Sequence, residues 1–377
     1  MKRWLVLLAV LAGCQMSGAA SSSWPFWNHY VAYFVKPEGR VIDPDRNSMT
    51  TSEGQSYAMF FALVANDRAM FERLRSWTEG NLAKGDLSKN LPAWSWGAKP
   101  DGSWGVLDPN SASDADLWTA YDLIEAGDLW AVQQYSNAGA AMLALIAEDE
   151  TATLPNLTKV LLPGNVGFHW FNTRWLLNPS YTPVPLLLAA NRVDKRGPWK
   201  QILDAFPIWM GKASPSGFAM DWVEYTLGTG FAPVSAPGDT RTARGSYDAI
   251  RVYLWAGMSP GEVEESTQLL QILKPMQRYV EAHMSPPESV NPDGSIASEK
   301  APPGFAAAMV PFLVTEGDAD AATFQLRNVL AQFDSVTGLL AHPPRYYDQN
   351  LALFALGWQD GRFRFAPDGK LRVQWKN

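Results

Sequence analysis

The chain has 377 residues, 47% hydrophobic and 18% charged, so it can build a large core and does not have a disordered composition. The formal net charge is −7, whereas a nucleic-acid-binding protein is expected to present a basic face. Neutral glycans remain compatible with an acidic surface, and the 17 tryptophans provide flat apolar rings that either fill the core or stack on sugars.

Residues 1–20 are predicted to be a signal peptide. Lys2 and Arg3 are followed by an apolar run, 4–12, that is too short to span a bilayer. The sequence LAGC at 11–14 resembles a bacterial lipobox, and Cys14 is the only cysteine. Lipidation of Cys14, which would anchor the protein to the outer membrane, and cleavage after residue 19 or 20 both stay open. Either route predicts a periplasmic or secreted protein, and no other stretch is predicted to cross a membrane.

Six segments with apolar residues around most of their helical circumference recur along the chain. Most begin at Ser, Thr or Asn, which cap helix starts, and they span 51–65, 113–130, 178–190, 246–256, 303–314 and 346–358. Amphipathic helical stretches at 135–150, 198–211 and 260–283 lie between them. Buried helices alternating with surface helices predict an all-α fold, an (α/α)6 barrel, with residues 24–377 as one domain. An irregular helical bundle is the alternative.

Two segments break this alternation. Residues 84–110 are rich in Gly, Pro, Trp and Asp and are predicted to form a long loop. Residues 362–375 alternate apolar and polar side chains around a Pro-Asp-Gly turn, which predicts a C-terminal β-hairpin.

Metal and cofactor chemistry is not indicated, because the four histidines are scattered and no phosphate loop, dinucleotide fingerprint or nucleophile elbow is present. The remaining candidates are carboxylates near the starts of the buried helices, namely Glu53, Asp114, Asp116, Asp248 and Asp348. Each alone is explained by the helix dipole, which favours acids in the first turn. In the barrel, however, the buried helices run parallel and their starts gather at one end. Several carboxyl groups meeting there would suit glycoside hydrolysis, which needs one protonated and one ionised carboxyl group.

Around these carboxylates the chain resembles the family 8 glycoside hydrolases, in particular the endoglucanases encoded with bacterial cellulose synthase. The resemblance covers about 24–358 and is carried by residues 40–43 (RVID), 51–57 (TSEGQSY), 110–116 (NSASDAD), 178–181 (NPSY) and 246–251 (SYDAIR). It implies an inverting endo-1,4-β-glucanase without a cofactor that acts in cellulose biosynthesis or export. A β-1,4-glucan chain and the cellulose synthase or export complex are the implied partners.

The resemblance also implies roles for individual residues. Glu53 would be the general acid, Asp248 the base that activates water, and Asp114 the residue that holds and distorts the sugar. The implied substrate-contacting residues are Tyr57, Trp94, Trp96, Tyr181, Tyr247, Arg251 and Tyr347, with Tyr346 as the alternative to Tyr347. Arg251 would orient the base or the sugar, and Tyr181 the sugar ring and the water.

Three details qualify the site. The family pattern has Ile or Met in place of Thr119, and Ala or Ser in place of Asp122, which puts local packing in question. Asp116 lies two positions from Asp114 on a helix and so is interpreted as structural. Glu53 must keep its proton against its own helix dipole, so acidic or apolar neighbours are expected. An exposed Glu53 paired with an arginine would contradict the acid role.

Two other functions remain open. One is a non-catalytic glucan-binding component of the secretion machinery, although both the acid and the base are present. The other is a family 8 hydrolase acting on chitosan, xylan or mixed-linkage glucan.

Overall fold

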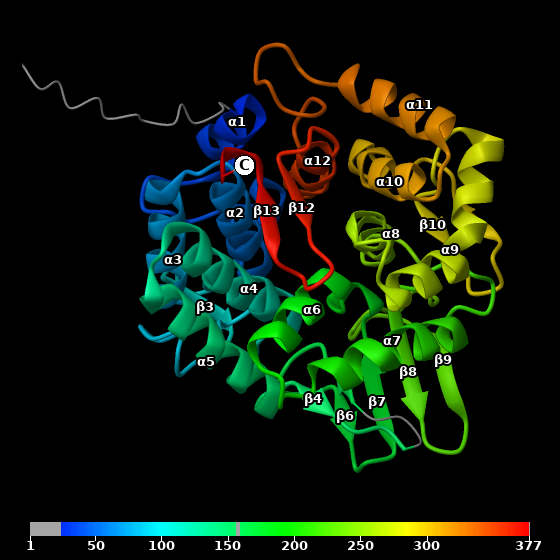
Figure 1. The fold of residues 1–377 in the computed structure, drawn as a ribbon, viewed down its shortest axis with the longest axis horizontal. Helices are drawn as coiled ribbons and strands as arrows, with labels where there is room; N and C mark the ends of the chain where they lie inside the picture. The colour runs from blue at the N-terminus through cyan, green and yellow to red at the C-terminus, as the bar shows by residue number, and fades with distance from the viewer. Residues whose placement is uncertain (1–23, 156–158, 377) are drawn as a thin grey trace, which may run out of the picture.

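The computed structural model describes residues 24–155 and 159–376, so the predicted signal peptide and Cys14 lie outside the described part. Six helices form a closed inner ring in which each contacts the next and the last contacts the first (Figure 1). They are α2 (Ser52–Val64), α4 (Ser113–Trp130), α6 (Val184–Val193), α8 (Ala249–Met258), α10 (Pro303–Thr315) and α12 (Tyr346–Gln359).

Five outer helices each pack on the inner helix that precedes them, and α1 packs on α12 to complete the sixth pair. The outer helices are α1 (Pro25–Phe34), α3 (Arg68–Asn81), α5 (Gln133–Asp149), α7 (Trp199–Ala213), α9 (Glu264–His283) and α11 (Ala319–Leu330). This closed double ring confirms the predicted (α/α)6 barrel over an irregular bundle. Among the described residues, no helix is long and apolar enough to cross a membrane.

The third inner helix begins later than the sequence pattern predicts. Asn178 accepts a hydrogen bond from the backbone N–H of Ser180 and so caps the short 3-10 helix η2 (Pro179–Tyr181). The α-helix α6 starts only after Pro183, whose fixed φ and missing N–H suit the entrance of a helix. The NPSY run therefore forms a separate turn at the end of the barrel where the inner helices begin.

Aromatic side chains fill the centre of the inner ring. Trp118 of α4 lies 5.0 Å from Phe60 of α2 and 5.3 Å from Trp255 of α8, measured between ring centroids. Phe354 of α12 lies 5.0 Å from Trp255 and 5.2 Å from Phe60. Each such pair adds about 0.5–1.5 kcal/mol beyond the burial of its apolar area. At least these tryptophans therefore serve the core and not the substrate.

Strands form in two regions where the sequence pattern predicts none. The predicted loop 84–110 contains β2 (Ser95–Ala98) and β3 (Trp104–Asp108), which continue antiparallel from β1 (Thr50–Thr51). A four-stranded antiparallel sheet in the order β6-β7-β8-β9 is formed by His169–Trp170, Arg174–Leu177, Trp222–Thr226 and Gly230–Val234. The prediction of a long loop over 84–110 was therefore wrong at 95–98 and 104–108. Short Gly- and Trp-containing strands give little periodic signal.

Further short elements border the barrel. The predicted C-terminal hairpin is confirmed as β12 (Phe363–Phe365) and β13 (Leu371–Val373), and Leu371 N–H donates to the buried Glu125 of α4 over 2.9 Å. The hairpin crosses the end of the ring where the inner helices finish (Figure 1). The others are β4 (Thr151–Ala152), β5 (Val160–Leu161), β10 (Ser289–Val290), β11 (Ile296–Ser298), η1 (Pro44–Arg46) and η3 (Gln374–Lys376).

Candidate active site

Glu53 stands in the first turn of α2 and is the one residue of that helix that is not buried. The Thr51 hydroxyl accepts a hydrogen bond from Gly54 N–H over 3.1 Å and so caps the helix. Ser52 N–H donates to the carbonyl oxygen of Trp94 over 3.0 Å, which fixes the helix start against the β2 hairpin. The Glu53 carboxylate is therefore left free of the cap, with 22% of its side chain exposed.

Arg251 of α8 joins the three carboxyl groups that the sequence singles out. Its Nη1 pairs with Glu53 and also lies 3.1 Å from Oδ2 of Asp114, while its Nη2 lies 2.6 Å from Oδ1 of Asp248. The side chain of Arg251 is 3% exposed and that of Asp114 is 2% exposed, whereas that of Asp248 is 29% exposed. These four residues form what we call the Arg251 cluster, built from the starts of α2, α4 and α8.

One cation cannot neutralise three carboxylates, so the Arg251 cluster holds excess negative charge. Burial, opposed by Arg251 and reinforced by the charges of Glu53 and Asp248, raises the pKa of Asp114 to about 7. Asp114 can therefore retain a proton near neutral pH, at a site where Arg251 also contacts Glu53 and Asp248. A site that retains a proton in this way has the first requirement of general acid catalysis.

The neighbours of Glu53 agree only in part with the acidic or apolar surroundings expected for a general acid. Asp114 provides the expected acidic neighbour, but Arg251 is a cationic one. Glu53 is paired with Arg251, but only 22% of its side chain is exposed, so it meets one of the two conditions that together would contradict the acid role. The acid role of Glu53 stays a prediction.

Tyrosine side chains surround the Arg251 cluster. Arg251 Nη1 donates to the hydroxyl of Tyr57 over 3.1 Å, and the guanidinium carbon lies 5.6 Å from the ring centre of Tyr181. The hydroxyl of Tyr347 donates to the carbonyl oxygen of Tyr247, and these two rings lie 5.9 Å apart. Tyr247 is 43% exposed, so its ring is accessible from solvent.

The choice between Tyr346 and Tyr347, left open by the sequence, has a structural answer. Tyr346 is 7% exposed and turns its ring toward Phe34 of α1, with its hydroxyl against Gly54. Tyr347 instead lies close enough to Arg251 for the positive charge to act on its hydroxyl group, and it is bonded to Tyr247. Tyr347 is thus the one of the two that borders the Arg251 cluster.

Trp94 and Trp96 occupy different environments. Trp94 adjoins the start of α2 through its carbonyl oxygen. Trp96 packs edge-on against Trp77 of α3 at 5.3 Å and lies 5.4 Å from Trp104. The Arg40 guanidinium sits 5.1 Å from both the Trp96 and Trp104 rings. Trp104, 48% exposed, was not singled out from the sequence, because an isolated tryptophan in a Gly-rich segment carries no positional signal.

Asp116 and Asp348 do not join the Arg251 cluster. Asp116 is fully buried, and burial together with the neighbouring Glu150 raises its pKa well above the usual range. Asp348 Oδ1 accepts from Gly304 N–H at the start of α10 over 3.0 Å, and burial raises its pKa to about 6. Both placements agree with structural roles.

Asp221 is a polar residue near the site that sequence reasoning missed. Its Oδ1 accepts hydrogen bonds from three backbone N–H groups at the start of α8. Burial and the charge of Asp248 raise the pKa of Asp221 to about 7. Asp221 and Asp248 line a pocket of about 360 Å³, bordered also by Trp222, Tyr247 and Glu288. No motif marks Asp221, because it acts across 27 residues of sequence.

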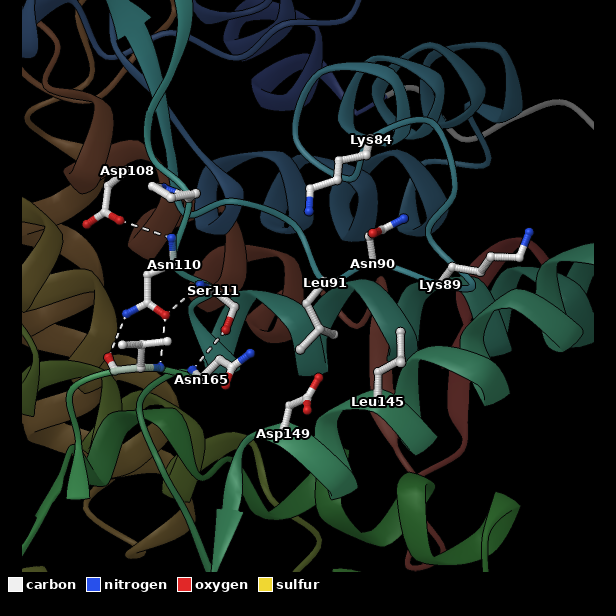
Figure 2. Close-up of a pocket in the computed structure, with 12 residues that line it drawn as sticks. Lys84, Lys89, Asn90, Leu91, Asp108, Asn110, Ser111, Leu145, Asp149 and Asn165 are labelled. Carbon is white, nitrogen blue, oxygen red and sulfur yellow. Dashed lines mark hydrogen bonds between the residues drawn. The ribbon is translucent and has the colours of Figure 1, made fainter. Parts of the chain in front are cut away.

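A second pocket, of about 450 Å³, opens beside the start of α4 (Figure 2). Asn110 bridges it by donating to the Val166 carbonyl over 2.8 Å and accepting from Val166 N–H over 3.1 Å. The lining includes two lysines, Lys84 and Lys89, and two aspartates, Asp108 and Asp149, so its formal charges balance. It lies outside the Arg251 cluster. In the described part of the chain, no group of three His, Cys, Asp or Glu residues could hold a metal ion.

Comparison with known proteins places the chain in a family. Residues 2–361 match glycosyl hydrolases family 8. An endoglucanase of Escherichia coli strain K12 is 42% identical over 372 residues, which are 98% of this chain and 96% of that protein. The crystal structure of an endo-1,4-D-glucanase from Vibrio fischeri ES114 superposes with a TM-score of 0.86 at 39% identity, covering 94% of this chain and 100% of that one. An endo-β-1,4-glucanase from Acetobacter xylinum gives a TM-score of 0.69 at 27% identity, covering 89% and 97%. The chain therefore belongs to glycosyl hydrolases family 8.

Proposed function

We propose that this protein is an endo-1,4-β-glucanase that hydrolyses β-1,4-glucan with inversion of the anomeric configuration. The observation that carries the proposal is the convergence of Glu53, Asp114 and Asp248 on Arg251, at the end of the barrel where the inner helices begin. Endoglucanases from several bacteria that are similar over nearly their whole length support glucan as the substrate.

In this mechanism Glu53 protonates the leaving glycosidic oxygen and Asp248 removes a proton from the attacking water. Inversion needs room for that water between the base and the sugar. The Asp248 side chain is 29% exposed, so a water molecule can reach its carboxylate. Asp114, buried and bonded to Arg251, is suited to hold a sugar hydroxyl and not to exchange protons freely with solvent.

The test compares Glu53→Gln and Asp248→Asn with the unaltered enzyme on soluble cellulose derivatives. Each variant is expected to lose kcat by about 10²–10⁴-fold, the usual contribution of a general acid or base. Near-unaltered turnover by either variant would remove that residue from its role. NMR of a defined cello-oligosaccharide should show the α-anomer first, and initial release of the β-anomer would exclude inversion.

The same assays separate the remaining functions. Xylan, chitosan and mixed-linkage glucan, tested beside cellulose, should each be cut more slowly than cellulose. A preference for one of them would move the substrate assignment within the family. Glucan binding without reducing-end release by the unaltered protein would identify a non-catalytic binding component.

We further propose that the protein acts outside the cytoplasm, in the periplasm or as a secreted protein, with the machinery that synthesises and exports cellulose. The predicted signal peptide and the lipobox-like sequence ending at Cys14 support this location. Mass spectrometry of the mature N-terminus should show either a lipidated Cys14 or a terminus after residue 19 or 20. An intact residue 1 on the active protein would contradict export.

A further inference from the structure

Helix α8 begins without a capping side chain of its own. Asp248 occupies the position before the first helical residue, where an aspartate normally accepts a hydrogen bond from a backbone N–H of the first turn. Its side chain makes no such bond, and its Oδ1 points instead to Arg251 Nη2 over 2.6 Å. The N–H groups at this helix start therefore need another acceptor.

Asp221, which directly precedes β8, supplies that acceptor. Its Oδ1 accepts from Ser246 N–H over 2.7 Å, from Asp248 N–H over 3.1 Å and from Ala249 N–H over 2.8 Å. Its own backbone N–H donates to the Arg244 carbonyl over 2.8 Å. One carboxylate oxygen thus holds the backbone on both sides of Asp248.

The turn before Asp248 is held by backbone groups as well. Gly245 and Val290 exchange two hydrogen bonds of 2.9 Å, and the Ser246 hydroxyl donates to the Glu288 carbonyl over 2.7 Å. A Cβ at position 245 would lie 1.9 Å from the carbonyl oxygen of Ala219, so only glycine fits. The hydrogen bonds of the Asp221 side chain connect this fixed turn to the first residues of α8.

A carboxylate that caps its own helix cannot also be turned toward a water molecule in the cleft. We propose that Asp221 is the positioning residue of the reaction: it takes over the cap of α8 and thereby leaves the Asp248 carboxylate free and correctly placed to activate water. This inference rests on the proposed function, in which Asp248 is the base. Asp221 touches neither the sugar nor the attacking water in this role.

The central experiment measures kcat and KM for Asp221→Ala and Asp221→Asn. The alanine variant should lose kcat by about 10²-fold with KM nearly unchanged, because a displacement of about 1 Å in a reacting group has that effect. The asparagine variant keeps an acceptor oxygen and should recover most of kcat. Asp221→Glu keeps the charge but moves the oxygen, so it should be slower than Asp221→Asn. The reverse order would show that charge, not position, is what matters, and would overturn the proposal.

A double variant tests whether Asp221 acts through Asp248. Once Asp248→Asn has removed the base, adding Asp221→Ala should lower kcat by no more than about twofold, since residues acting as a unit are not additive. Multiplied losses would mean that Asp221 acts independently. If Asp248→Asn alone keeps its turnover, the proposed function fails. If Asp248→Asn is inactive and Asp221→Ala is fully active, only the present inference fails.

Asp318→Ala is the matched control for a lost helix cap. Asp318 accepts from Ala321 N–H over 3.0 Å at the start of the outer helix α11, at the opposite end of the barrel. It should lower the unfolding midpoint much as Asp221→Ala does while leaving kcat unchanged. An equal fall in kcat in both variants would reduce the effect to general destabilisation and refute the positioning role. Should Asp221→Ala fail to fold, the Asn and Glu variants still decide the question by their order.

Discussion

Replacing Arg251 with methionine would remove the one cation of the Arg251 cluster and leave three carboxyl groups facing one another. Loss of one partner from a buried ion pair costs about 3–5 kcal/mol. Asp114 is 2% exposed, but Glu53 and Asp248 are 22% and 29% exposed and are partly screened by water. We therefore expect the lower end, about 3 kcal/mol, as the loss in the free energy of unfolding near pH 8.

The loss should depend on pH in a defined direction. The pKa of Asp114 is already raised to about 7, and removing Arg251 takes away a charge that lowers it. A carboxyl whose pKa is higher in the folded protein binds more protons there, so its stabilising effect is complete below the pKa of the unfolded chain and fades as pH rises. The deficit of Arg251→Met should accordingly shrink as pH falls from about 8 toward about 4.

Urea unfolding followed by tryptophan fluorescence at several pH values measures this directly. Arg251→Lys is the control, because it keeps a positive charge while losing the two-pronged geometry. It should show a smaller and less pH-dependent deficit than Arg251→Met. A deficit of Arg251→Met that is the same at acidic and alkaline pH would assign the loss to packing and refute the electrostatic reasoning.

Three further predictions concern stability and cofactor need. Asp122 is fully buried without a hydrogen-bond partner among the described residues, and burial raises its pKa. The free energy of unfolding of Asp122→Ala, measured in urea, should therefore rise by about 1 kcal/mol near pH 8 and should not change near pH 3. Gly257→Ala should lower the free energy of unfolding by about 1–3 kcal/mol, because the new Cβ would lie 2.2 Å from the backbone nitrogen of Phe312. Gly80→Ala, which has open space around the new Cβ, should raise the free energy of unfolding by about 0.5–1 kcal/mol. Dialysis against a chelator should leave glucanase activity unchanged, and a loss restored by a divalent cation would contradict this.

The inner ring was predictable because burial all around a helix leaves a continuous apolar pattern in the sequence. The starts of α2 and α4 agree with that pattern to within one residue. The four-stranded sheet was not predictable in the same way. Its strands are two to five residues long, and the pair β7–β8 joins Arg174 to Thr226 across a whole helix pair. Such pairings leave little local periodicity.

The residues of the candidate site also differ in whether the sequence could predict them. Glu53, Asp114 and Asp248 could be found because they stand at helix starts inside recognisable runs, and the fold brings those starts together. Asp221 could not be found, because its function depends on a backbone that it meets only in the folded protein. Residues that act on neighbouring side chains or backbone from a distant part of the chain leave no pattern that a single sequence reveals.

The helix starts of the barrel present a common physical problem, because unpaired N–H groups draw nearby carboxylates into capping bonds. At α2 the cap is made by Thr51 and at α8 by Asp221, so the two carboxylates assigned to proton transfer, Glu53 and Asp248, stay free of backbone N–H groups. Asp114 does accept a backbone N–H, from Ala115 over 2.8 Å, and it is the one assigned to hold the sugar. In the proposed mechanism, capping by other residues thus separates the carboxyl groups that exchange protons from the one that holds the sugar.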